Sequence, residues 1–277
     1  MKRLDFISII GNYQPISEQE KERSVFMTLQ EFFTQHPKVA LAFSGGTDSS
    51  FLMWQAKQLG CDIHAYYVST AFQPKFELEH ALQLAKQLDV PLTVVQADVL
   101  SVKKAAENPA DRCYHCKQAL FTLLWQKAHA DQHTILIDGT NASDDAGDRP
   151  GMKALQELKV LSPLRECGIT KQQVRELSRK AGLFTWNKPS YACLATRIPT
   201  GTAITLKALQ LVEQAENCLS ELGFSDFRVR LNQHGCYIQI TEKQLDLLLQ
   251  QRQSILDSLP VQLRPITLDL QFRTPSI

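Results

Sequence analysis

The stretch from Ala40 to Ser50 constrains the fold of this chain more than any other part of it. It reads Ala-Leu-Ala-Phe-Ser-Gly-Gly-Thr-Asp-Ser-Ser. The apolar run 39–43 predicts a short buried strand, and apolar residues at helical spacing over 49–59 predict a helix. Residues 44–48 therefore form the turn from the end of a buried strand into the start of a helix.

This turn has the composition of an anion site. Gly45 and Gly46 permit positive φ and leave room for a ligand, and the N–H groups and positive dipole end of the helix face the same point. Asp48, Ser49 and Ser50 add a carboxylate and hydroxyls suited to a phosphate or to hydrated Mg²⁺. The turn lacks the Lys-Ser/Thr end of a P-loop. The alternative is an ordinary turn whose polar side chains only cap the helix.

Strands and helices alternate after this turn. We expect strands at 62–68, 92–96 and 134–137, and a helix at 76–88. Strands that alternate with helices at this interval form a parallel sheet with right-handed crossovers, and ligands bind at the carboxyl ends of its strands. The predicted fold class is therefore α/β with a parallel sheet, and the glycine turn lies at its binding edge.

The pattern changes near residue 201. We expect helices and strands that together make a small α+β domain: helices at 205–222 and 242–259, and strands at 227–231, 237–240 and 266–270. The chain then divides into a helical extension with a capped start at Ser17 to Glu20, a parallel-sheet domain, and an α+β domain for substrate binding or oligomerisation. These are residues 1–35, 36–200 and 201–277.

Composition excludes several classes of protein. The 277 residues are 44% hydrophobic and 21% charged, as in ordinary globular proteins, and a net charge of +1 gives no general attraction to nucleic acid or membrane. No apolar run approaches the roughly 20 residues of a membrane span, and Asp5 interrupts the N-terminal one. We therefore expect a cytoplasmic protein. Seven cysteines, an odd number, argue against a disulfide framework.

A Cys-x-x-Cys pair, Cys113 and Cys116, precedes an apolar helix expected at 120–125. Such a pair is a redox centre, half of a zinc site, or two ligands of an iron–sulfur cluster, unless both are helix residues without a role. No second close pair completes a zinc site. The flanking Arg112 and Lys117 are expected to stabilise thiolates.

Three further segments carry polar or reactive residues. The loop 186–199 holds Cys193 in its middle, and if it folds over the crevice, three thiolates would leave one ligand position open to a substrate. Asp-Gly-Thr-Asn, which contains Gly139, follows a strand and points into the same crevice, with Asp144 and Asp148 after it. Arg228 and Arg230 alternate on one strand face, as a phosphate clamp or as a solvated surface.

These segments occur together in one order that resembles a known family. Beside the Ser-Gly-Gly loop, the chain carries Arg-Cys-Tyr-x-Cys-Lys, Asp-Gly-Thr-Asn to Arg-Pro-Gly, Ser-Pro-Leu-Arg, Trp-Asn-Lys-Pro-Ser-x-x-Cys-Leu-Ala-x-Arg and Arg-Val-Arg. This set resembles the LarE family of ATP-dependent sulfur transferases, in the PP-loop ATP pyrophosphatase superfamily, over nearly the whole chain beyond the first 35 residues.

The resemblance implies a PP-loop fold and a two-step reaction. ATP would adenylate a carboxylate of pyridinium-3,5-biscarboxylic acid mononucleotide, and sulfur would then replace AMP, on the route to a nickel-pincer nucleotide cofactor. One branch of the family gives up sulfur from a cysteine at the position of Ala192, and another uses three cysteines that bind a [4Fe-4S] cluster. Cys113, Cys116 and Cys193 match the second branch.

The resemblance also implies roles for other residues. Ser44, Gly45, Gly46, Asp48, Ser49 and Gly139 would bind ATP, with Asp48 as the Mg²⁺ ligand. Arg228 and Arg230 would hold the substrate phosphate, and Lys117 would lie near the nucleotide or the substrate. Glu216 resembles a metal-binding position, or is a surface residue of its helix.

Partners and alternatives follow from the same resemblance. We expect a small-molecule nucleotide substrate and a homo-oligomer, with no membrane or nucleic-acid partner, while the sulfur donor is open. The alternatives are a PP-loop tRNA thiolase with a three-cysteine cluster and a regulatory protein that binds ATP without turnover.

Overall fold

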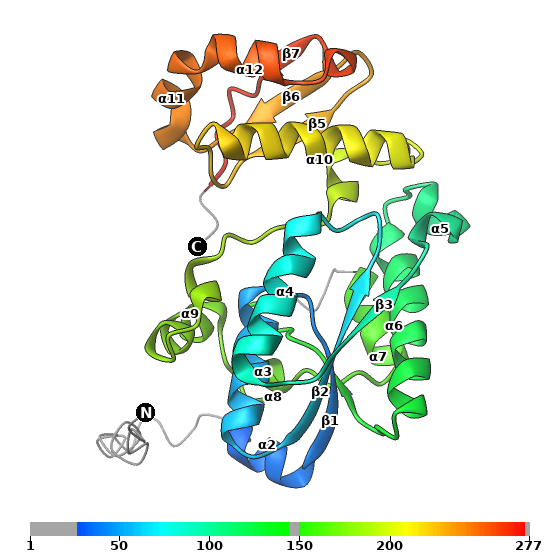
Figure 1. Ribbon diagram of the computed structural model, residues 1–277. Helices are drawn as coiled ribbons and strands as arrows, with labels where there is room; N and C mark the ends of the chain where they lie inside the picture. The colour runs from blue at the N-terminus through cyan, green and yellow to red at the C-terminus, as the bar shows by residue number, and fades with distance from the viewer. Residues whose placement is uncertain (1–26, 145–149, 275–277) are drawn as a thin grey trace, which may run out of the picture.

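The computed structural model describes residues 27–144 and 150–274 (Figure 1). Its larger sheet has four strands in the order β3-β2-β1-β4, all paired in parallel. These strands are β1 (Lys38–Ala42), β2 (Asp62–Ser69), β3 (Leu92–Gln96) and β4 (Leu136–Ile137). The α/β class with a parallel sheet is confirmed. β4 is shorter than predicted, and a bridge from Ile137 to Leu161 extends the sheet beside it.

Helices cover both faces of this sheet. Side chains of β1 alternate between two cores, because successive strand residues point to opposite faces. Val39 and Leu41 pack with Phe51 of α3 (Thr47–Gln58) and with α4 (Lys75–Leu88). On the other face, Ala40 packs in the core that contains Leu124 of α6 (Arg112–Ala130). The result is a three-layer arrangement, visible in Figure 1.

The predicted elements of this part need one correction. α6 begins at Arg112 and not near residue 120, so Cys113 and Cys116 lie in its first turns. The predicted cap at Ser17 to Glu20 lies outside the described residues. Within them, α2 (Leu29–Gln35) has Thr28 as its N-cap, which forms a capping box with Glu31. The remaining short elements are η2 (Val99–Ser101), α5 (Lys103–Ala106), α7 (Pro150–Glu157), α8 (Pro163–Glu166), α9 (Lys171–Lys180), η3 (Phe184–Asn187) and η4 (Leu194–Arg197).

The C-terminal region has its own sheet and core. α10 (Leu206–Glu221) packs beside β5 (Arg228–Leu231), β6 (Cys236–Gln239) and β7 (Ile266–Leu268), in the order β5-β6-β7. Figure 1 shows this region above the carboxyl end of the larger sheet. The boundary after residue 200 stays a prediction. No helix of residues 27–144 and 150–274 has the length and apolarity to cross a bilayer.

The single helix predicted at 242–259 is wrong. The structure has η5 (Glu242–Gln244), α11 (Leu245–Gln250) and α12 (Arg252–Ser258), followed by η6 (Val261–Leu263). The chain breaks at Gln251, which ends α11 and begins α12. This break allows Leu245, Leu247 and Leu248 of α11 and Ile255 of α12 to pack on one core.

A buried ion pair joins η4 to α10. Nε of Arg197 donates to Oε1 of Glu216 at 2.8 Å, and a second guanidinium nitrogen lies 3.1 Å from Oε2. Both side chains are almost fully buried. Glu216 also accepts the backbone N–H of Val229, and Arg197 donates to the carbonyl of Ala192 at 2.8 Å. The pair therefore fixes the loop 186–199, called the reactive loop below, against the C-terminal region. The surface alternative for Glu216 is wrong.

We expect Glu216→Gln or Arg197→Met to lower the free energy of unfolding by about 3–5 kcal/mol, because each leaves a buried charge without its partner. The double variant Arg197→Met/Glu216→Gln should cost less than the sum of the two single changes. Urea titration measures both. Lys57→Met, in the exposed pair with Asp89, is the control and should cost less than about 1 kcal/mol. A similarly small effect of Glu216→Gln would contradict the prediction.

Candidate functional site

The glycine turn has an open helix N-terminus. Gly45 has a φ of 70°, and the N-cap of α3 is Gly46, with no side-chain hydrogen bond to the cap. The alternative of a turn whose side chains only cap the helix is therefore wrong. The hydroxyl of Ser44 lies 3.0 Å from that of Ser49, which shapes the turn from inside. The free N–H groups and the helix dipole favour an anion at this point.

Gly139 is required by close packing against the same helix. A Cβ placed there would lie 2.7 Å from the backbone nitrogen of Ser49 and 3.0 Å from its Cα. Because these are backbone atoms, a side chain at 139 would displace the start of α3. The structure therefore puts Gly139 behind the glycine turn, where it supports the position of the N-terminus of α3.

A cavity of about 380 Å³ opens from this turn at the carboxyl ends of β1 and β2. Its walls combine the turn, an apolar patch of α6 and the loop that leads to Cys193. The lining includes Ser44, Gly46, Thr47, Asp48, Tyr66, Glu77, Leu120, Phe121, Leu124, Lys171, Lys188, Tyr191 and Cys193. The glycine turn and Cys193, one of the three predicted cysteines, thus line the same cavity.

Asp48 is paired with a residue that sequence reasoning missed. Nζ of Lys171, the first residue of α9, lies 2.5 Å from Oδ2 of Asp48, while Oδ1 is buried and has no hydrogen-bond partner among the described residues. Burial raises the pKa of the Asp48 carboxyl, and the Lys171 ammonium partly offsets this. The sequence gives no signal for Lys171, since 123 positions separate the two residues.

Lys188 and Glu77 are a second pair of charges in the cavity. Lys188 donates to the carbonyl of Gly45 at 3.1 Å and so ties the reactive loop to the phosphate turn. Burial raises the pKa of Glu77 to about 7, although the nearby positive charges of Lys188, Arg197 and Arg228 oppose the rise. Glu77 lies in the helix predicted at 76–88, where the sequence indicates no role for it.

The three predicted cysteines are brought together by α6 and the reactive loop. Burial, reinforced by Cys193 and Cys113, raises the pKa of Cys116 to about 12, and burial also raises that of Cys193. A guanidinium nitrogen of Arg112 lies 3.9 Å from Sγ of Cys113. Arg112 and Lys117 lower the pKa of Cys116, as expected, and Arg112 lowers that of Cys193. Burial raises both pKa values by more, so the net effect does not favour the thiolates.

A metal ion and a cluster make different demands on these thiols. Within the described ranges, no three His, Cys, Asp or Glu side chains are close enough to share one metal ion. A cluster bonds its cysteines to different irons, so its ligands need not converge on one point.

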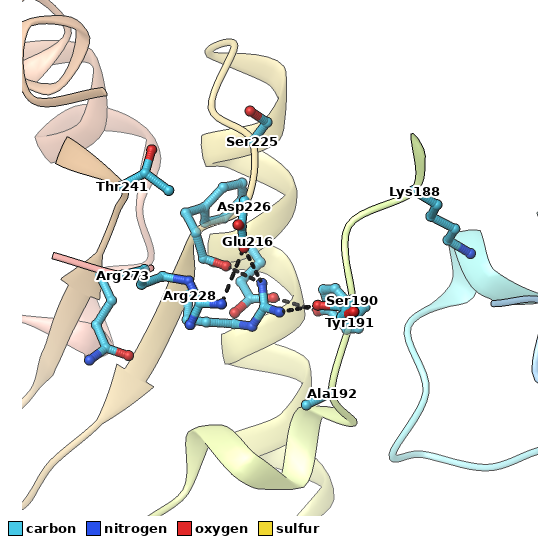
Figure 2. Close-up of polar contacts among 12 residues, drawn as sticks. Lys188, Ser190, Tyr191, Ala192, Glu216, Ser225, Asp226, Arg228, Thr241 and Arg273 are labelled. Carbon is cyan, nitrogen blue, oxygen red and sulfur yellow. Dashed lines mark hydrogen bonds and ion pairs between the residues drawn. The ribbon is translucent and has the colours of Figure 1, made fainter. Parts of the chain in front are cut away.

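The arginines of β5 hold the reactive loop. Arg228 donates to the carbonyl of Ser190 at 2.6 Å, and Arg230 donates to that of Thr196 at 2.5 Å (Figure 2 shows Arg228). Arg228 is buried, so the solvated-surface alternative is wrong for it. Burial, with Arg197 and Arg273 nearby, lowers the pKa of Arg228 to about 10.

Arg273, which sequence reasoning left without a role, belongs to this group. It contacts Asp226 at 3.1 Å, and Arg228 lies 4.0 Å from the same carboxylate. The ring of Tyr191 lies between Arg197 and Arg228, at 4.6 and 5.0 Å from their guanidinium carbons. Figure 2 shows Arg228 and Tyr191 between the small sheet and the loop.

The other predicted residues lie farther from the cavity lining. The stem of Lys117 packs beside Gly151, where a Cβ would lie 3.0 Å from Cδ of the lysine. Asp144 is electrostatically close to Asp48. Asp148 and the neighbouring Arg149 lie outside the described residues.

We expect Glu77→Gln to stabilise the protein more at pH 8 than at pH 5. Because the pKa of Glu77 is raised by folding, the folded state holds a proton that the unfolded state releases, and the free energy of unfolding falls as pH rises from below 5 to above 7. The rise in pKa to about 7 corresponds to no more than about 3 kcal/mol.

Chemical denaturation of wild type and Glu77→Gln at both pH values measures this difference. Glu79→Gln is the matched control, because Glu79 is exposed on the same helix. A stability difference between Glu77→Gln and wild type that does not change with pH would contradict the prediction.

Comparison with known proteins identifies the family. Residues 38–109, which contain the glycine turn, match the family model described as queuosine biosynthesis protein QueC. An uncharacterized protein of Synechocystis is 36% identical over 80% of this chain and 83% of its own length. A tRNA-specific 2-thiouridylase of Clostridium botulinum is 26% identical over 54% of this chain and 52% of its own.

A further relative carries a defined activity. Pyridinium-3,5-bisthiocarboxylic acid mononucleotide synthase of Lactiplantibacillus plantarum is 31% identical over 75% of this chain and 76% of its own length. Identity over this share of both chains, with the PP-loop match at the glycine turn, is sufficient to assign a family. The chain belongs to the LarE family of ATP-dependent sulfur transferases and is an enzyme.

Proposed function

We propose that this enzyme adenylates a carboxylate of pyridinium-3,5-biscarboxylic acid mononucleotide with ATP and replaces the AMP by sulfur. The observation that carries the proposal is the cavity that the phosphate turn shares with Cys193. The relative from Lactiplantibacillus plantarum supports the choice of substrate. We propose the boundaries 36–200 and 201–277 for the nucleotide and substrate domains, in a cytoplasmic homo-oligomer.

The first step transfers AMP to the substrate. A carboxylate oxygen attacks the α-phosphorus of ATP, the bond to the bridging oxygen breaks, and pyrophosphate leaves. The N–H groups at the start of α3 bind phosphate oxygens, and Asp48 would hold the Mg²⁺ that neutralises part of their charge. The apolar side chains of Leu120, Phe121 and Leu124 exclude water, which would otherwise hydrolyse the acyl adenylate.

The second step forms the carbon–sulfur bond. Sulfur at the oxidation level of sulfide attacks the activated carbonyl carbon and AMP leaves, so no oxidant or reductant is consumed. Cys113, Cys116 and Cys193 would hold a [4Fe-4S] cluster, whose ligands are cysteine thiolates. This proposal is supported by their closeness, since the three thiols lie near enough to raise one another's pKa. When bound, the cluster supplies an iron position without a protein ligand, where the sulfur to be transferred can be held.

The arginine group suits the phosphate of the substrate mononucleotide. Arg197, Arg228 and Arg273 face two carboxylates, those of Glu216 and Asp226, which leaves one positive charge in excess. Arg228 is buried, and a phosphate interacts strongly with a guanidinium in such a setting. We propose that Arg228 and Arg230 bind this phosphate, with Lys117 at the edge of the site.

The tRNA thiolase alternative shares the PP-loop but requires a different surface. Its relative from Clostridium botulinum covers 54% of this chain. Binding of tRNA calls for a broad basic surface, and the chain carries a net charge of only +1. Membership of an enzyme family speaks against the regulatory alternative without turnover.

We expect AMP and pyrophosphate to form in proportion to added pyridinium-3,5-biscarboxylic acid mononucleotide and not to added tRNA. Anaerobically reconstituted protein with a sulfide source should also yield the thiocarboxylate, which mass spectrometry detects. Cys193→Ala should still adenylate the substrate but lose at least about 100-fold in sulfur incorporation, because a ligand of the proposed cluster is missing.

Cys218→Ala is the control for this experiment. Cys218 lies on α10 and packs against the core of the C-terminal region, whereas the three cysteines of the proposal lie on α6 and in the loop 186–199. Its sulfur incorporation should match wild type. AMP formation that depends on tRNA, or unchanged sulfur incorporation in Cys193→Ala, would contradict the proposal.

A further inference from the structure

We propose that Lys171 exchanges Asp48 for a phosphate oxygen of ATP when Mg²⁺ binds to Asp48. This inference rests on the proposed function, since it assigns Lys171 to binding the phosphates that leave as pyrophosphate. It makes Lys171 a phosphate-binding residue supplied by α9, an element far from the glycine turn in sequence.

The position of Lys171 is fixed by the start of its helix. Thr170 and Gln173 form a reciprocal capping box, and the backbone N–H of Lys171 donates to the hydroxyl of Ser143 at 3.0 Å. Its side chain then extends into the cavity and reaches Asp48, with 23% of the lysine and 21% of the aspartate side chain exposed. The backbone is anchored, whereas the four-carbon stem can rotate.

Asp48 is incompletely satisfied by this contact. Its Oδ2 accepts from Lys171, but its Oδ1 is buried without a hydrogen-bond partner among the described residues. A buried carboxylate oxygen left bare is costly, and an oxygen-ligated Mg²⁺ ion would remove that cost. Both cations would then crowd one carboxylate, and their mutual repulsion favours the departure of the lysine.

The other charged groups around Asp48 do not take this role. Arg175 donates to the carbonyls of Trp186 and Lys188, each at 2.9 Å, and is therefore fixed. Asp144, which also faces Asp48, is negative and adds to the attraction for Mg²⁺. Lys171 is the neighbouring cation whose ammonium is held by Asp48 itself.

The place to which the Lys171 ammonium would move, at the N-terminus of α3, lies in the same cavity. The N-terminus of α3 carries N–H groups that no side-chain cap covers, and phosphate oxygens bound there lie beside Asp48. A lysine released by Mg²⁺ meets this negative charge and stabilises the pyrophosphate as it leaves.

The test compares metal and nucleotide binding in Lys171→Met, which keeps the stem but removes the charge. Binding of Mn²⁺ to the nucleotide-free protein, followed by electron paramagnetic resonance, should become at least about five-fold tighter because the competing cation is gone. Binding of Mg·ATP, followed by calorimetry, should become about 10- to 100-fold weaker because one charged hydrogen bond to phosphate is lost.

Two further variants keep the test decisive. Lys171→Gln removes the charge but retains a hydrogen-bond donor to Asp48, so it should fold and show the same opposite changes. Lys180→Met, at the exposed end of α9, is the matched control and should change neither affinity.

The outcomes separate the inference from the proposed function. Tighter Mn²⁺ binding with unchanged Mg·ATP affinity would mean that Lys171 only neutralises Asp48, and would overturn the exchange. Wild-type protein that binds Mg·ATP but does not adenylate the pyridinium mononucleotide would overturn the proposed function alone. Wild-type protein without affinity for Mg·ATP would overturn both.

Discussion

The buried ion pair between Arg197 and Glu216 is the interaction on which the arrangement of the site depends. Two charges of this kind are expensive to bury, and they persist here because further hydrogen bonds satisfy both groups. Those bonds reach the carbonyl of Ala192 and the backbone of Val229. The pair therefore sets the position of the loop that carries Cys193 relative to the small sheet. Since the loop is fixed to the C-terminal region, the backbone that carries Cys193 is fixed as well.

The other end of the same loop is fixed to the nucleotide side. Lys188 donates to Gly45 in the phosphate turn, and Arg175 of α9 holds the loop carbonyl of Lys188. The loop consequently forms one wall of the cavity at the carboxyl edge of the parallel sheet. In the reaction we propose, activation of the carboxylate and delivery of sulfur act on the same carbon atom, and one shared cavity wall would bring both to it.

Local sequence patterns predict much of the fold but few of these hydrogen bonds and ion pairs between distant segments. The strands and helices around Ala40 to Ser50 were predicted because alternation and helical spacing are local signals. The start of α6 at Arg112 was missed because its first turns carry polar residues and cysteines without helical periodicity. Lys171 and Glu77 were missed because their surroundings are created by packing between distant segments. The family resemblance selected the three cysteines, and the fold explains how they come together.

The most direct test of the shared cavity is the alkylation rate of each cysteine in metal-free protein, measured by mass spectrometry with and without Mg·ATP. Cys193 lines the cavity, whereas Cys113 is exposed outside it. The account predicts that Mg·ATP slows alkylation of Cys193 severalfold and leaves Cys113 unchanged. Equal rates at Cys193 with and without Mg·ATP would contradict it.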